Sequence, residues 1–201
     1  MRRQRVRNRI DSGAVVARET LMTIQGSAVS VPAGDALVHL QFRRFAGCPL
    51  CELHLASFAR RHEEIEAAGI REVVIFHSTA DALLPYAADM PFSVIADPDK
   101  RIYGQFGVGA APRALLDPRA WGAILRGIHR SLRRVLRGAQ PVPSLHPEGG
   151  RFGLPADFLI DRDGVVLARK YGAHAYDQWS VDQLLALIGS QLGSGSTALR
   201  A

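Results

Sequence analysis

The chain has 201 residues, of which 47% are hydrophobic, enough for one α/β domain with a core and too few for two. Its formal net charge of +6 rests on 25 basic residues, but these concentrate at the N-terminus and in one later helix rather than around a nucleic-acid-binding motif, so we expect no nucleic-acid partner. Two cysteines are too few for a secreted disulfide scaffold and predict a working dithiol in a reducing compartment, by default the cytoplasm.

Residues 1–20 are polar, charged and aperiodic, which predicts a flexible basic tail. The arginines near the start resemble the charged part of an export signal, but residues 10–25 contain no apolar run longer than Ala14 to Ala17, so we expect none. No apolar run approaches the length of a membrane span. We therefore expect one folded domain over residues 21–192 and a frayed end over residues 193–201.

The first half of this domain alternates strand and helix patterns. A weak alternation over residues 22–31 predicts a short hairpin or edge strand, and residues 36–42 predict a strand. Apolar residues then recur at helical spacing to about residue 68, and residues 72–77 form the near-continuous apolar run of a buried parallel strand. These patterns predict a right-handed βαβ unit, whose first strand ends where open α/β sheets place their sites.

Both cysteines lie at the junction of that strand and helix, in the sequence Cys48-Pro49-Leu50-Cys51. A thiol at a helix start meets unpaired N–H groups and the positive end of the helix dipole, which favour the thiolate. Pro49 suits the first helical position because its φ is already helical. Cys51 lies one turn further on, on the apolar side and within reach of a disulfide. We therefore predict that Cys48 attacks and Cys51 resolves.

Other interpretations of the cysteines are open. They could be two unrelated buried residues, or they could bind a metal with His54, which extends the spacing to C-x-x-C-x-x-H. A closed zinc site needs four ligands, however, and the sequence has no second cysteine pair and no H-x3-5-H pair. A c-type haem would need histidine directly after the second cysteine, where Glu52 stands. We expect neither metal nor cofactor.

A short helix is expected over residues 80–88 and a strand over residues 91–97. Within the following segment, 112–150, a helix over residues 119–137 is amphipathic. Its apolar side contains Trp121, Ile124, Leu125, Ile128, Leu132, Val135 and Leu136, and its opposite side Arg126, Arg130, Arg133, Arg134 and Arg137. We expect the apolar side to cover the core; binding to a partner or to a membrane surface is the alternative.

The end of the chain returns to regular patterns. Residues 157–171 predict a β-hairpin with its turn at 162–164, and a final helix begins with the capping box Ser180 to Gln183. Because the segment 112–153 leads directly into Leu154-Pro155 and this hairpin, we expect it to cover or border the cysteine site.

The order of strand, C-x-x-C helix, strand, hairpin and helix is similar to that of the thioredoxin fold. Residues 42–51 and 153–161 more narrowly resemble the peroxiredoxin-like branch of the alkyl hydroperoxide reductase C/thiol-specific antioxidant (AhpC/TSA) family. The resemblance implies an α/β fold with a central mixed sheet flanked by helices and a helical insertion, residues 112–150, before the hairpin. Leu154-Pro155 resembles the cis-proline that thioredoxin-like proteins place against their cysteines.

The resemblance also implies thiol redox chemistry, with Cys48 matching the peroxidatic cysteine. Two groups that handle peroxide in typical peroxiredoxins differ here: Phe45 stands in place of a Thr or Ser, and Pro155 in place of an arginine that many members carry. Arg43 or Arg44 could replace that arginine. A cis-proline with a C-x-x-C belongs instead to disulfide exchange.

From these features we predict a thiol-disulfide oxidoreductase that cycles a Cys48/Cys51 disulfide. Its substrate would be a protein or small-molecule disulfide or a peroxide, and an external thiol would reduce it again. A thiol peroxidase that forms a Cys48 sulfenic acid is the alternative, and a redox sensor or binding module is a third function, of another class. A homodimer is compatible with all three.

Overall fold

The computed structural model describes residues 9–111, 117–144, 147 and 149–195. The strands are β1 (Glu19–Met22), β2 (Ala28–Val31), β3 (Leu37–Phe42), β4 (Ile70–Phe76), β5 (Ser93–Ala96), β6 (Ala156–Ile160) and β7 (Val166–Tyr171). The helices are α1 (Pro49–Arg60), α2 (His62–Ala67), α3 (Ala80–Ala87), α4 (Arg101–Gln105), α5 (Pro118–Leu136) and α6 (Val181–Gly195).

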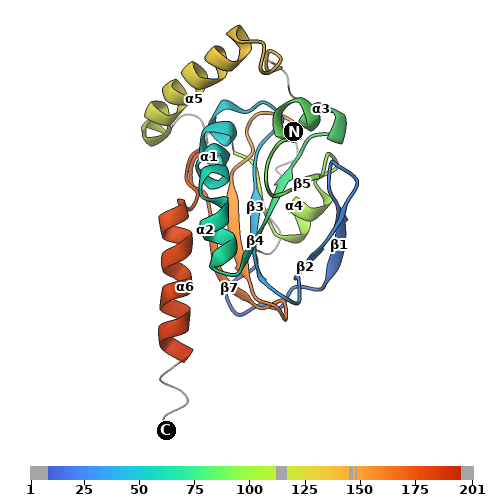
Figure 1. Cartoon of the computed structure of the whole chain (residues 1–201), viewed down its shortest axis with the longest axis vertical. Coiled ribbons are helices and arrows are strands. Elements are labelled where there is room, and N and C mark those ends of the chain that lie inside the picture. The colour runs from blue at the N-terminus through green and yellow to red at the C-terminus, as the bar shows by residue number, and fades with distance from the viewer. Residues whose placement is uncertain (1–8, 112–116, 145–146, 148, 196–201) are drawn as a thin grey trace.

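Five strands form one mixed sheet in the order β5-β4-β3-β6-β7. β3 and β4, and β4 and β5, pair in parallel, whereas β6 pairs antiparallel with both β3 and β7. β1 and β2 form a separate hairpin. Figure 1 shows α1, α2 and α6 on one side of the sheet and the β1–β2 hairpin with α4 on the other. The expected mixed sheet and parallel βαβ unit are confirmed.

Each face of the sheet has its own apolar core. Val38, Leu40 and Phe42 alternate along β3 and pack with α4 and the hairpin. The opposite face packs against α1, α3 and α6, through residues that include Leu55, Leu83 and Leu184. The side chains of β3 are therefore buried on both faces, including the polar ones, which the alternating pattern alone does not show.

The helix that follows the cysteines is shorter than expected. It is interrupted at Arg61, whose φ of −116° and ψ of 22° are not helical, so that α2 begins as a separate turn at His62. The capping box of α6 is confirmed: the Ser180 N–H donates to Gln183 at 3.0 Å, and the Gln183 N–H donates to the Ser180 hydroxyl at 3.2 Å.

The predicted flexible tail over residues 1–20 is wrong for its second half. The Gly13 N–H donates to the Val166 carbonyl at 2.8 Å, and the Val16 N–H donates to the Gly164 carbonyl at 2.9 Å. These bonds attach the segment to the β6–β7 hairpin, and β1 begins already at Glu19. The arginines of residues 1–8 lie outside the described residues, and at the other end α6 continues to Gly195.

The predicted packing of the amphipathic helix is also wrong for most of its apolar side. α5 uses its small side chains, Ala120, Ala123, Gly127 and Ser131, as its buried face. Of the predicted apolar side, Ile124 packs against the core and Val135 is half-buried. The other five residues are at least half exposed, namely Trp121, Leu125, Ile128, Leu132 and Leu136. Figure 1 shows α5 beyond the end of α1, away from the sheet. None of the helices in the described part of the chain is long and apolar enough to cross a membrane.

The predicted cis-proline is wrong as well. Among the described residues the cis peptide bond joins Val31 to Pro32, whereas Leu154-Pro155 is trans. Pro155 still comes directly before β6, and its carbonyl accepts from the Gly172 N–H at 2.9 Å, which ties the start of β6 to the end of β7. In this structure Pro155 therefore helps to pair β6 with β7 and does not form a cis turn.

Candidate active site at the start of helix α1

Cys48 is the residue that caps α1. After β3 ends at Phe42, the chain turns so that the Cys48 N–H donates to the Phe45 carbonyl at 3.1 Å and the Cys48 carbonyl accepts from the Glu52 N–H at 3.0 Å. Pro49 occupies the first helical position, as expected. The turn needs glycine at position 47, because φ there is 71° and a Cβ would lie 2.7 Å from the Tyr86 ring.

The two cysteines approach each other to near 3.2 Å, and both are free thiols. Only 1% of Cys48 and 4% of Cys51 is exposed. The Arg44 N–H donates to the Cys51 sulfur at 3.5 Å, which fixes that thiol beside Cys48. This arrangement needs only a small movement to close a disulfide.

The two thiols differ in acidity. Burial alone raises the pKa of Cys48, but a hydrogen bond from the Cys51 thiol, the positive charge of Arg44 and the backbone N–H groups of the helix start together lower that pKa to about 6. Burial, and the proximity of the Cys48 thiolate, raise the pKa of Cys51 well above its usual value. At neutral pH the pair is therefore a thiolate that accepts a hydrogen bond from a thiol.

We expect the alkylation rate of the reduced protein to titrate at Cys48 with a midpoint near pH 6. Because the thiolate is the nucleophile, the rate should reach its plateau at a pH well below about 8.5, the pKa of a free thiol. The measurement is the rate of iodoacetamide labelling against pH, with the labelled cysteine located by peptide mass spectrometry. A midpoint at or above that of a free thiol would contradict the assignment of Cys48 as nucleophile.

A small, mostly apolar cavity of about 20 Å³ lies over the cysteines, with room for about one water molecule. Apart from the cysteines it is lined by Phe45, Ala46, Gly47, Glu52, Leu55, Phe76, Leu83, Tyr86, Ala87 and Met90. The Tyr86 ring packs on Gly47, and its hydroxyl donates to the Pro141 carbonyl at 3.4 Å, in the segment that follows α5. Tyr86 thus joins α3 to that segment over Cys48, and a bulky substrate needs this cover to open.

Of the two neighbouring arginines, Arg44 acts on the cysteines. It is buried, its guanidinium stacks on the Phe45 ring at 5.2 Å and donates to the Arg151 carbonyl, and its positive charge favours the Cys48 thiolate. Arg43 is committed elsewhere, since it donates to Asp157 at 2.7 Å. Of these two residues, Arg44 is therefore the one whose charge reaches the cysteines.

The structure also contains a buried polar network that the sequence analysis does not predict. Arg43 forms an ion pair with Asp157 and also donates a hydrogen bond to His54 at 3.0 Å. The Asp157 carboxylate also lies 3.3 Å from His39. Burial opposes ionisation of Asp157, but the positive charge of Arg43 and the hydrogen bond with His39 hold its pKa well below its usual range. Burial lowers the pKa of His54, which therefore accepts from Arg43 as a neutral ring. His54 thus belongs to this network.

The expectation that the segment 112–153 borders the cysteine site is confirmed for its described residues. A Cβ at Gly127 of α5 would lie 2.8 Å from the Pro49 carbonyl oxygen, so the two backbones are in direct contact beside Cys48. Further along, the Arg151 carbonyl accepts from Arg44. Glu52 is buried between α1 and this segment; burial raises its pKa, and the positive charges of Arg134 and Arg130 oppose that rise.

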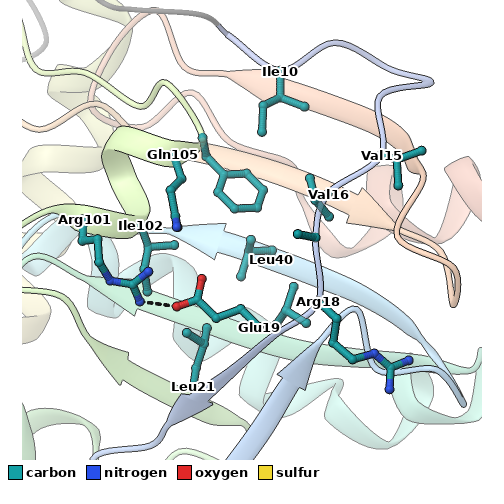
Figure 2. A pocket seen from close by; sticks show the side chains of 13 residues that line it. Ile10, Val15, Val16, Arg18, Glu19, Leu21, Leu40, Arg101, Ile102 and Gln105 are labelled. Atoms are coloured by element: carbon teal, nitrogen blue, oxygen red, sulfur yellow. Dashed lines mark ion pairs between the residues drawn. The ribbon is translucent and has the colours of Figure 1, made fainter.

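A larger hollow of about 450 Å³ lies elsewhere, between the N-terminal segment and α4. Figure 2 shows its lining, in which Glu19 and Arg101 form an ion pair and most other side chains, such as Ile10, Leu40 and Ile102, are apolar. The lining contains no cysteine or histidine and has its one carboxylate paired. Both cysteines line the smaller cavity instead.

Comparison with models of known protein families finds a match to one family. Residues 57–174, more than half of the chain, match the family described as AhpC/TSA antioxidant enzyme. The matched region begins after Cys51, so the roles of the two cysteines depend on their geometry. No curated protein matches the chain significantly.

Solved structures share the fold at low sequence identity. Peroxidoxin BcpB from Mycobacterium tuberculosis is 18% identical, with a TM-score of 0.62 over 89% of this chain and 96% of that one. The reduced 2-Cys peroxiredoxin of Plasmodium vivax is 12% identical, with a TM-score of 0.63 over 92% and 83%. A putative thiol:disulfide interchange protein DsbE from Chlorobium tepidum is 22% identical, with a TM-score of 0.50 over 90% and 99%. These similarities confirm the thioredoxin-like fold.

Proposed function

Since this chain belongs to the AhpC/TSA antioxidant enzyme family and is a peroxiredoxin-like, thiol-dependent oxidoreductase, we propose that it works by dithiol–disulfide exchange at Cys48 and Cys51. The observation that carries the proposal is the asymmetry of the pair: two cysteines near 3.2 Å apart, one with a lowered and one with a raised pKa. Such a pair supplies one nucleophile and one protected resolving thiol.

The reaction follows from this asymmetry. The Cys48 thiolate attacks one sulfur of a substrate disulfide, so that a Cys48–substrate bond forms, the substrate S–S bond breaks and one substrate thiolate leaves. The Cys51 thiol then loses its proton and attacks the Cys48 sulfur, which releases the second substrate thiol and leaves a Cys48–Cys51 disulfide. An external thiol reductant returns two electrons and two protons, which suits a reducing compartment such as the cytoplasm.

Peroxide reduction is the second candidate, and Arg44 is the observation that favours it, because its charge would stabilise both the thiolate and a developing negative charge on oxygen. The Cys48 thiolate would attack one oxygen of hydrogen peroxide, so that an S–O bond forms, the O–O bond breaks and the leaving hydroxide takes up a proton to become water. The Cys51 thiol would then attack the sulfenic acid sulfur, form the disulfide and release a second water. We rank this reaction lower because the Phe45 side chain, which lines the cavity, offers no hydrogen bond to a peroxide oxygen.

The proposal predicts an intramolecular disulfide as the product of the reaction. We expect that one equivalent of a small aromatic disulfide oxidises the reduced protein to a Cys48–Cys51 disulfide, which dithiothreitol then reverses. Peptide mass spectrometry without reduction identifies the linkage, and thiol titration counts the lost thiols. Serine variants of each cysteine are the matched controls. If the thiols survive, or if the products are intermolecular disulfides, the proposed reaction is wrong.

A further inference from the structure

The apolar stripe of α5, defined as Trp121, Leu125, Ile128, Leu132 and Leu136, is exposed along its whole length. These residues follow one another at intervals of four, three, four and four, which keeps them on one side of the helix. They are 57%, 69%, 50%, 54% and 77% exposed. Isolated exposed apolar residues are common on protein surfaces, but a continuous stripe of large ones marks an interaction site.

The stripe is not available to the core of this domain. α5 contacts α1 through its small residues instead, and at Gly127 its backbone is so close to Pro49 that no side chain fits between them. Turning the stripe inward would place leucine or tryptophan side chains where only glycine and alanine fit. The stripe therefore faces outward as part of the packed structure.

Beside the stripe lies the arginine flank, defined as Arg119, Arg126, Arg133 and Arg137, whose spacing of seven, seven and four puts them on one side of the helix. All four are exposed, and none of them takes part in an ion pair within the described part of the chain. Residues 118–137 contain six arginines and no acidic residue. The helix thus has an apolar face next to an uncompensated positive one.

We propose that α5 binds flat on an anionic lipid bilayer surface, with the apolar stripe in the boundary between headgroups and acyl chains and the arginine flank at the lipid phosphates. A basic amphipathic helix with a Trp- and Leu-rich face is the structure that binds such interfaces. Anionic lipids contribute about 1 kcal/mol for each arginine near the surface, in addition to the apolar burial.

Charge complementarity favours an anionic bilayer over a second copy of the chain as the binding partner of α5. A dimer formed through the stripes would combine two helices of the same positive charge, and neither helix has an acidic residue between residues 118 and 137 to balance it. An anionic membrane offers the opposite charge. Because α5 contacts α1 through Gly127 on its small-residue face, binding through the stripe would leave α5 between the bilayer and the Cys48 end of α1.

The test is sedimentation of the full chain with vesicles. We expect binding to vesicles of phosphatidylcholine mixed with phosphatidylglycerol, weaker binding as salt is raised, and little binding to phosphatidylcholine alone. The pair Leu125→Gln and Leu132→Gln should weaken binding more than about 100-fold, and the pair Arg126→Ser and Arg133→Ser by about 30-fold. The pair Arg18→Ser and Arg162→Ser removes the same charge from exposed positions elsewhere and should bind almost as the unchanged protein does.

Three results would overturn the proposal. The first is absence of binding to the anionic vesicles, and the second is binding that the two leucine substitutions leave unchanged, since another surface would then be responsible. The third is a stable dimer in sedimentation velocity that the leucine substitutions dissociate, because a second copy would then cover the stripe. Circular dichroism and an unchanged pH profile of Cys48 alkylation show that each variant is folded.

Discussion

Cys51→Ser should accumulate a stable mixed disulfide on Cys48 when the reduced variant meets a small aromatic disulfide or a protein disulfide. Cys48 can still attack, because its thiolate keeps Arg44 and the helix start, and serine retains a hydroxyl donor in place of the Cys51 thiol. Without the resolving sulfur the second substrate thiol is not released. We expect near-stoichiometric adduct in this variant and almost none in the unchanged protein.

The adduct is measured by intact-protein mass spectrometry after an acid quench, and its position by peptide mapping. Cys48→Ser is the matched control and should trap nothing, because the raised pKa of Cys51 leaves it as an unreactive thiol at neutral pH. Adduct on Cys51 in that control, or none on Cys48 in Cys51→Ser, would reverse or remove the assigned roles. Rapid peroxide consumption by Cys51→Ser, with a detectable sulfenic acid, would favour the peroxidase instead.

The second large effect is expected on stability. Asp157→Asn should lower the free energy of unfolding by about 3–5 kcal/mol, because it leaves the fully buried Arg43 guanidinium without its charge partner. The measurement is urea denaturation at pH 7. Asp163→Asn, an exposed aspartate in the nearby β6–β7 turn, is the control and should change stability by less than about 0.5 kcal/mol. A loss below about 1 kcal/mol for Asp157→Asn would show that the pair is not structurally important.

The same pair sets an expected pH dependence. The pKa of Asp157 is depressed in the folded protein, so its contribution to stability is complete above the pKa of the unfolded chain, about 3.9. As pH falls below about 4, protons bind the unfolded state first and the contribution is progressively lost. The difference in unfolding free energy between the unchanged protein and Asp157→Asn should therefore shrink as the pH is lowered below about 4.

The local arrangement of the cysteines could be predicted from the sequence because every determinant is close in the chain. A strand pattern, Pro49 at the first helical position and the C-x-x-C spacing together place both thiols, and the helix start explains the lowered pKa of Cys48. The burial of Cys48 could not be predicted in the same way. It depends on Tyr86 from α3 and on α5, which are distant in sequence.

The orientation of α5 shows a limit of periodicity. The pattern finds the amphipathic helix and its two faces, but it does not reveal that a third face of small residues packs more closely than the apolar one. Ala120, Ala123, Gly127 and Ser131 lie at intervals of three and four, and this spacing is the signal that was missed. The close contact at Gly127 then decides which face is buried.

The Arg43–Asp157 pair was missed because its members are 114 residues apart and both sit where a strand pattern leaves polar residues facing outward. The antiparallel register is the signal that reveals them, since Gln41 lies opposite Asp157 and Arg43 follows two residues later on the same side. Those side chains are covered by α1 and α6, so the network is buried rather than solvated.

Disulfide exchange at Cys48 is tested most sharply by stopped-flow mixing of the reduced, unchanged protein at pH 7 with hydrogen peroxide and, separately, with a small aromatic disulfide at the same concentration. The loss of the Cys48 thiolate is followed in both. Because the Phe45 side chain that lines the Cys48 cavity donates no hydrogen bond to peroxide, we expect the disulfide to react at least about 10²-fold faster. Peroxide reacting as fast as the disulfide, or faster, would contradict disulfide exchange as the function of the Cys48–Cys51 pair.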